Sequence, residues 1–307
     1  MAARKIKASL LWQAARPSLL PTSQRRLYSS KPTKTALITG GGSGLGLRVA
    51  RDLAARGGWQ LHIADKNGAA AFKAANEIPG ATPYEVDVAD YNGLARVFQY
   101  AYASSGGRLD FVFANAGVPG LEPIYDKHDT GLQSPPEINL TTVRVLYDSV
   151  IYSWYLGMHY FRETLKTHDR SQIDPNMVIT ASCMALYNPD LNPIYTGAKH
   201  GAVGFMRCVA PLSHSQGVRV NAILPGSFRS GLLSPEGWKT FPAAAETPVD
   251  KVAEAVYILL DNKDPYLASE TRIDGRSQPK ADGSLWGEAL EISGNGLGAS
   301  EFRAGHS

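Results

Sequence analysis

The chain has 307 residues, 44% of them hydrophobic, and a formal net charge of +3 from 31 basic and 28 acidic side chains. Six basic residues precede residue 29, and the rest of the chain has 25 basic and 28 acidic residues, a net charge of −3. We therefore expect no basic surface for binding nucleic acid on the folded part. The sequence contains no run of 18 apolar residues, so we expect no membrane span. The two cysteines, Cys183 and Cys208, supply neither a disulfide framework nor zinc-ligand spacing, so we expect no metal.

Residues 1–32 are typical of a mitochondrial transit peptide. The first acidic residue is Asp52, and apolar residues occur only in patches between the basic ones. The stretch "RRLYSS" resembles a processing site with a cut between Tyr28 and Ser29. The expected location is the mitochondrial matrix. A disordered basic tail on a cytoplasmic protein is the alternative.

A glycine-rich turn follows in "TALITGGGSGLGLRVA", residues 35–50, with five glycines between positions 40 and 46. The lysine-bearing phosphate loop of nucleotide hydrolases is excluded, because Leu47 stands where its lysine is required. A linker would not join a β-type run (35–39) to a helical pattern with Leu45, Val49 and Leu53 on one face. In a strand–turn–helix unit, glycines let backbone amides approach a dinucleotide pyrophosphate at the helix N-terminus. Close packing alone is the competing explanation.

Further strands are predicted between helical patterns along the rest of the chain, at 59–65, 82–88, 109–117, 176–182, 218–226 and 288–293. Such alternation predicts an α/β fold, a Rossmann-type doubly wound parallel sheet of about seven strands with helices on both faces. One domain is expected from residue 33 to 303, with surface loops at 119–137 and 271–287. Its ligand crevice would lie at the carboxyl ends of the strands.

Two strand ends carry candidate cofactor contacts. Asp65 stands nineteen residues past Gly46, where a carboxylate can accept hydrogen bonds from the adenosine ribose, which favours NAD. A helix N-cap is the alternative role for Asp65. The small residues Asn115, Ala116 and Gly117 end the strand at 109–117 and would let a cofactor lie against the backbone.

In "IYTGAKHG", Tyr195 and Lys199 stand four apart and share a helix face. Chance alone would give about 0.6 such pairs in this chain, so the pair needs its context. Ser182 ends a predicted strand thirteen residues earlier, and Asn139 lies upstream in "EINL". With T-G-x-x-x-G-x-G and N-A-G in the same order, residues 33–300 closely resemble a short-chain dehydrogenase/reductase.

The resemblance implies roles for these residues. Tyr195 would be the acid/base, Lys199 would bind the nicotinamide ribose, Ser182 would orient the substrate oxygen, and Asn139 would complete a proton path. A positive neighbour and an oxidised nicotinamide would lower the tyrosine pKa from about 10. The remaining cofactor contacts implied by the resemblance are Gly40, Ser43, Gly44, Leu45, Gly46, Asp87, Val88, Pro225, Gly226 and Ser227, and it also implies a homo-oligomer, a dimer or tetramer.

The helical stretch after Asn139 is about seven residues longer than is usual in this family. Seven residues make nearly two turns, so the insert nearly preserves the phase of the apolar face. Whether the insert leaves Asn139 in the site or displaces it stays open. An error in gene-model splicing is another source of such an insert.

The stretch from Tyr195 to Gly226 most resembles the branch that contains 15-hydroxyprostaglandin dehydrogenase. The expected function is therefore NAD-dependent interconversion of a secondary alcohol and its ketone, with Tyr195 as acid/base. The substrate stays open. The alternatives are an NADPH-dependent ketoreductase of the same family and a non-catalytic NAD-binding interaction protein.

Overall fold

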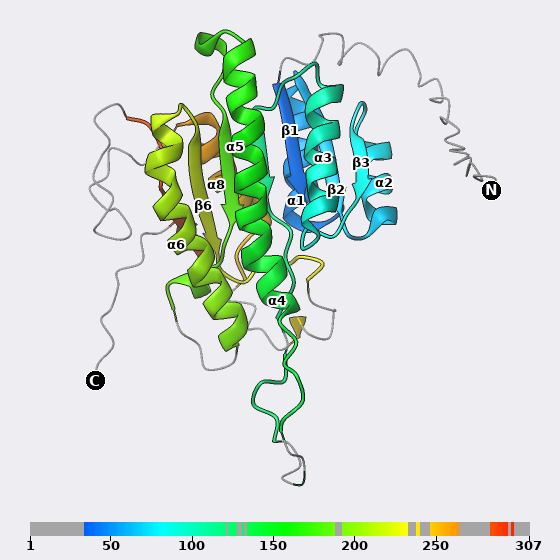
Figure 1. Ribbon diagram of the computed structural model, residues 1–307, viewed down its shortest axis with the longest axis vertical. Helices are drawn as coiled ribbons and strands as arrows, with labels where there is room; N and C mark the ends of the chain where they lie inside the picture. The colour runs from blue at the N-terminus through cyan, green and yellow to red at the C-terminus, as the bar shows by residue number, and fades with distance from the viewer. Residues whose placement is uncertain are drawn as a thin grey trace, which may run out of the picture.

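Strands and helices alternate in the computed structural model, which describes residues 34–120, 122–127, 131, 134–187, 192–232, 238–239, 246–263, 283–293 and 296–297 (Figure 1). The predicted transit peptide lies outside these residues, as does most of the loop at 271–287. The strands are β1 (Lys34–Thr39), β2 (Trp59–Asp65), β3 (Thr82–Glu85), β4 (Phe111–Ala114), β5 (Asn176–Thr180), β6 (Arg219–Pro225), β7 (Ala289–Ser293) and β8 (Gly296–Leu297). The main helices are α1 (Gly44–Arg56), α2 (Gly68–Glu77), α3 (Tyr91–Ser104), α4 (Thr141–Val143), α5 (Ser149–Thr167), α6 (Pro193–Ser215) and α8 (Val249–Asp261).

The strands form one sheet in the order β3-β2-β1-β4-β5-β6-β7-β8. The first seven strands in chain order pair in parallel, which confirms the predicted doubly wound sheet, and β8 adds a short antiparallel edge. All seven residues of β6 are buried, as expected for a parallel strand covered on both faces. The strand order reverses between β1 and β4, and in open α/β sheets ligands bind at the carboxyl ends of the strands at such a switch point.

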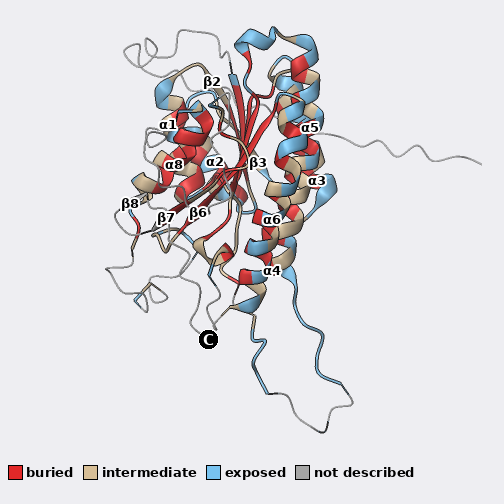
Figure 2. Cartoon of the chain, turned by 90° about the vertical axis from the view of Figure 1, so that its left-hand side faces the viewer, coloured by how far each residue is buried: buried red, intermediate tan, exposed pale blue. Residues whose placement is uncertain are grey.

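Helices cover both faces of the sheet. Seen on edge, α1, α2 and α8 lie on one side, and α3, α5 and α6 lie on the other (Figure 2). Two hydrophobic clusters fill the layers between helices and sheet, the first including Phe98, Phe161 and Met206 and the second Leu53, Phe113 and Val256. Among the described residues, no helix is long and apolar enough to cross a membrane.

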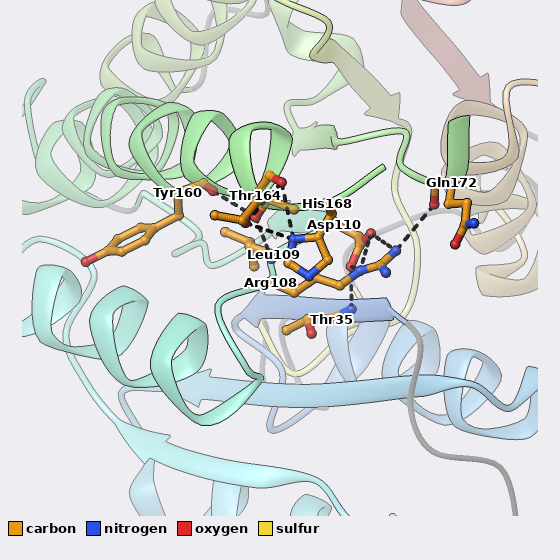
Figure 3. A network of polar contacts seen from close by, with 9 residues as sticks. Thr35, Arg108, Leu109, Asp110, Tyr160, Thr164, His168 and Gln172 are labelled. Carbon is orange, nitrogen blue, oxygen red and sulfur yellow. Dashed lines mark hydrogen bonds and ion pairs between the residues drawn. The ribbon is translucent and has the colours of Figure 1, made fainter. Parts of the chain in front are cut away.

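A polar network fixes the other ends of β1 and β4, away from the crevice (Figure 3). The buried Asp110 carboxylate accepts the Thr35 amide at 2.8 Å and two guanidinium nitrogens of Arg108. The hydroxyl of Thr164 on α5 accepts the Leu109 amide at 2.9 Å. This network joins the N-terminal ends of β1 and β4 to each other and to α5. It therefore helps to fix the register of the two strands, and with it the position of the residues at their carboxyl ends.

Candidate active site

The glycine-rich turn between β1 and α1 is a tight backbone reversal. Gly40 and Gly44 have φ of +63° and +51°, values that side chains rarely tolerate. A Cβ at Gly46 would collide with the Gly40 carbonyl oxygen. Ser43 occupies the N-cap of α1 but makes no side-chain capping bond, so it leaves the first-turn amides, including those of Leu45 and Gly46, to another acceptor. This turn has the form of an anion-binding helix start.

The segment after β6 lies over this turn. A Cβ placed on Gly44 would lie 3.5 Å from the Cβ of Ser230. A Cβ placed on Gly231 would lie 3.5 Å from the Ser43 hydroxyl oxygen. Farther back, the Gly226 amide donates to Ile292 and the Ser227 carbonyl accepts the Thr247 amide. The predicted contacts stopped at Pro225, Gly226 and Ser227. Ser230 and Gly231 were missed, since an irregular loop carries no periodic signal.

The carboxylate of Asp65, at the end of β2, faces the glycine-rich turn. Its Oδ2 accepts the Gly42 amide at 2.9 Å, and its Oδ1 accepts the Asn67 amide at the same distance. The N-cap of α2 is Asn67, whose side chain accepts the Ala70 amide. Asp65 is therefore not the helix cap that was its alternative role. It joins the turn after β1 to the turn after β2.

Beside Asp65, the ends of β2 and β3 are joined by an ion pair. Lys66 Nζ lies 2.8 Å from Asp87, whose other oxygen accepts the Ala89 amide. Val88, which follows Asp87 in the chain, is buried. Asp87 and Val88 thus lie on the same edge of the sheet as Asp65, where the resemblance put the adenine contacts.

The turn after β4 packs directly on the glycine-rich turn. The amides of Asn115 and Ala116 both donate to the Thr39 hydroxyl, at 3.0 and 3.2 Å. A Cβ at Gly40 would lie only 2.8 Å from the Cα of Ala116. Gly117 faces the buried Leu146. Small residues are needed here because two backbones meet.

Ser182, Tyr195 and Lys199 come together beyond β5. Ser182 is buried two residues after the strand ends, and its hydroxyl is close enough to the Tyr195 phenol to lower the pKa of that phenol. Tyr195 stands in the first turn of α6, whose N-cap Asn192 accepts the Tyr195 amide. Lys199, one turn on, is buried, with its Nζ 5.6 Å from the centre of the Tyr195 ring and 2.7 Å from the Thr180 carbonyl oxygen. The three side chains therefore lie together, and their catalytic roles stay predictions.

Burial governs the titration of this group. Burial raises the pKa of Tyr195 and outweighs the Ser182 hydrogen bond, which lowers it. Burial also lowers the pKa of Lys199 to about 7. The expected fall in the tyrosine pKa is therefore not found in the protein alone, because a dry site disfavours the phenolate and the ammonium that would stabilise it.

Asn139 makes its side-chain hydrogen bond elsewhere. It is exposed, and its side-chain oxygen accepts the Thr141 amide at the start of α4. From there α4, a π-helical turn (Arg144–Asp148) and α5 run on without a break, so Asn139 precedes a long helix. Thr142 instead packs on Gly120 against Tyr195. The role of Asn139 in a proton path therefore stays a prediction, and its side-chain oxygen is engaged at the start of α4.

Among the described residues, no group of three His, Cys, Asp or Glu side chains is placed to hold a metal ion. Ser182, Tyr195 and Lys199 supply a hydroxyl, a phenol and an amine, groups that bind and move protons. Together with the bare turns at the switch point, they form an arrangement able to hold a dinucleotide beside an acid/base group.

Comparison with known proteins agrees with this site. Residues 34–238 match the short-chain dehydrogenase family model. A short-chain dehydrogenase/reductase from Penicillium rubens is 37% identical over 258 residues, covering 82% of this chain and 89% of the relative. An NAD(+) 15-hydroxyprostaglandin dehydrogenase from Bos taurus is 31% identical over 208 residues, 65% of this chain and 70% of the relative.

The fold also has solved counterparts. A 3-ketoacyl-(acyl-carrier-protein) reductase from Brucella melitensis, complexed with NADH, superposes with a TM-score of 0.66 at 22% identity, covering 86% of this chain and 98% of that one. The family match spans most of the chain and contains the glycine-rich turn, Ser182, Tyr195 and Lys199. The chain belongs to the short-chain dehydrogenase/reductase family and is an oxidoreductase.

Proposed function

We propose that the protein interconverts a secondary alcohol and its ketone with NAD. The observation that carries this proposal is the group formed by Ser182, Tyr195 and Lys199 at the carboxyl edge of the sheet, in which Ser182 and Lys199 are buried and Tyr195 is half-buried. A packed core has no need of a lysine whose nitrogen is buried next to a phenol, because burying an ammonium is costly.

In the proposed reaction, the Tyr195 oxygen takes the hydroxyl proton of the alcohol as hydride leaves its carbon. Bound NAD supplies the hydride acceptor and a positive charge. Ser182 donates a hydrogen bond to the substrate oxygen and holds it near the phenol. Lys199, as an ammonium, favours the phenolate and binds the nicotinamide ribose. Because burial raises the pKa of Tyr195, the phenol needs the added positive charge to ionise, and because burial lowers the pKa of Lys199, the ammonium needs the ribose hydrogen bonds to stay protonated.

The choice of NAD rests on Asp65. Its carboxylate stands beside Gly42 at the mouth of the turn, so the phosphate that distinguishes NADP would meet a like charge there. The remaining proposed contacts are the first-turn amides of α1 for the pyrophosphate, Asp87 and Val88 for the adenine, and the segment from Pro225 to Ser230 for the nicotinamide side.

One observation favours the NADPH-dependent ketoreductase as a second candidate. Lys66 lies next to Asp65 with a largely exposed side chain, and it pairs with Asp87 across the same edge. A lysine that left Asp87 could bind a ribose phosphate. Asp65 opposes this reading, since its carboxylate is fixed by two amides and cannot swing away without breaking both bonds.

The likeness to the 15-hydroxyprostaglandin dehydrogenase supports oxidation as the working direction, on a small secondary alcohol. We also propose a homo-oligomer, a dimer or tetramer, as the family resemblance implies. The matrix of mitochondria is the proposed location, on the composition of the first 32 residues.

The test is an assay of purified protein with a panel of secondary alcohols and their ketones, each with NAD(H) and NADP(H). Oxidation of at least one alcohol with NAD, at higher kcat/KM than with NADP, is expected. Reduction with NADPH alone would favour the second candidate. Cofactor binding without turnover on any substrate would leave the non-catalytic alternative.

A further inference from the structure

Thr180, the last residue of β5, lies between the glycine-rich turn and Lys199. Its carbonyl oxygen accepts from Lys199 Nζ at 2.7 Å, and its hydroxyl donates to Asn115 Oδ1 at 3.1 Å. The backbone of Thr180 therefore holds the lysine while its side chain holds the turn after β4. Neither bond is required to form the sheet.

Asn115 passes this contact on to the glycine-rich turn. Its side-chain nitrogen donates to the carbonyl oxygens of Thr39 and Gly40, at 3.2 and 3.3 Å. These are the carbonyls at which β1 ends and the turn begins, and Gly40 already has a φ of +63°. The donor nitrogen of Asn115 thus fixes the first peptide groups of the turn.

The Thr180 hydroxyl determines which way the Asn115 amide faces. A side-chain amide has one acceptor oxygen and one donor nitrogen, so only one orientation serves the hydroxyl and the two carbonyls at once. Rotated by half a turn, the Asn115 oxygen would face the oxygens of Thr39 and Gly40. The hydroxyl that occupies the Asn115 oxygen therefore stabilises the orientation that holds the turn.

We propose that Thr180 is a positioning residue that couples the cofactor turn to the catalytic lysine. The connection runs from Lys199 through the Thr180 carbonyl, and from the Thr180 hydroxyl through Asn115 to Gly40. It sets the turn and the lysine at a fixed separation before any ligand binds, which lowers the ordering cost of binding. This inference rests on the proposed function for its purpose, though the hydrogen bonds themselves do not.

The test uses two variants that divide the side chain. Thr180→Val keeps the shape and removes the hydroxyl, and Thr180→Ser keeps the hydroxyl and removes a methyl group. NADH affinity is measured by fluorescence titration without substrate. Thr180→Val should weaken binding by about three- to tenfold, the effect of one lost hydrogen bond, while Thr180→Ser stays within about twofold of wild type. A packing role would give the reverse order, which would overturn the proposal.

A second measurement does not depend on the cofactor. Hydrogen exchange of the peptide spanning residues 37–47 in the ligand-free protein should be faster in Thr180→Val than in wild type or Thr180→Ser. Thr180→Ala, which also lacks the hydroxyl, replaces the valine variant if that one fails to fold. Unchanged exchange in the hydroxyl-free variant would overturn the proposal. If wild type binds neither NADH nor NADPH, the proposed function fails and exchange still decides the role of Thr180.

Discussion

Lys199 holds its amine 5.6 Å from the centre of the Tyr195 ring, and both groups are driven by burial toward their neutral forms. The pair in the ligand-free protein is therefore a phenol beside an amine of pKa about 7. Charge must be added before the phenol becomes a base.

Tyr195→Phe should abolish alcohol oxidation while keeping cofactor affinity. The phenol oxygen is the proton acceptor, whereas the glycine-rich turn and Asp65 are untouched by the change. We expect kcat to fall by at least about a hundredfold, the usual contribution of a general base, and the Kd for NADH to stay within about threefold. Steady-state kinetics and fluorescence titration measure the two. Turnover within tenfold of wild type would remove Tyr195 from its role.

Lys199→Met should stabilise the ligand-free protein near neutral pH. The lysine pKa is about 7 when folded and near 10.5 when unfolded, so between these values the unfolded chain binds more protons. Wild type therefore loses stability, relative to the variant, as pH falls from about 10 to 7, by on the order of a few kcal/mol. Urea unfolding at pH 7 and pH 9.5 measures the difference, which should shrink at the higher pH.

Lys73→Met is the matched control, since Lys73 is an exposed lysine on α2. Its stability difference from wild type should be the same at both pH values. If the Lys199→Met difference is equally flat, the lysine is not held near neutrality by burial.

Asp65 should set the cofactor preference. At about 4 Å and an effective dielectric of about 20, each pair of like unit charges costs about 4 kcal/mol before screening, so wild type should prefer NAD by at least about a hundredfold. Asp65→Ser should narrow this gap and weaken NAD. Asp65→Asn removes the charge but keeps an oxygen that can accept the Gly42 amide, so it distinguishes the effect of the charge from the effect of that hydrogen bond. Titration of both cofactors measures the change.

Lys66→Ala is the control for the neighbouring charge, because Lys66 pairs with Asp87. It should leave the preference for NAD in place. Equal affinities for NAD and NADP in wild type would show that the Asp65 carboxylate serves only to join the two turns.

Asn139→Ala should leave kcat/KM within about threefold of wild type, as for a surface substitution. The side chain is exposed and its oxygen accepts the Thr141 amide, so the loss is a helix-start contact. Kinetics beside thermal unfolding separates the two effects: a small drop in Tm with unchanged kcat is expected. A large loss of kcat at unchanged Tm would return Asn139 to the proton path.

Residues 1–34 fused to a fluorescent reporter should carry it into mitochondria, because their only charges are positive and their apolar residues come in patches. The full chain without residues 1–32 should stay diffuse. Mass spectrometry of the protein from cells should find a start at Ser29. A mature protein that begins at Met1 or Ala2, with a diffuse reporter, would contradict import.

The periodic features of the sequence could be predicted and the irregular contacts could not. The strand at 59–65 matches β2, and the four-residue spacing of Tyr195 and Lys199 brings them one turn apart on α6. These depend on repeats that a chain shows locally. Asp65 was predicted to bind the adenosine ribose. In the structure its carboxylate accepts the Gly42 amide, because the fold brings the ends of β1 and β2 together. That contact has no local signature.

Asn139 shows a second limit. The position of Asn139 depends on the number of helical residues between it and the part of the helix that packs on α6. A π-helical turn in this helix changes the rotation and rise per residue, so the position does not follow from the sequence spacing alone. Ser230 shows a third, since its position over Gly44 is set by an irregular loop. The direction of the Tyr195 pKa needed the burial of both partners, which no spacing reveals.

The two outer strands of the sheet bear on how the protein behaves at high concentration. An exposed strand with free amides and carbonyls is a template for intermolecular pairing. The outer strand β3 has only four residues and carries Pro83, which has no amide to donate, and β8 has only two residues. Little backbone is thus offered at either edge of the described sheet. Edge-to-edge pairing between copies of the described sheet is therefore disfavoured.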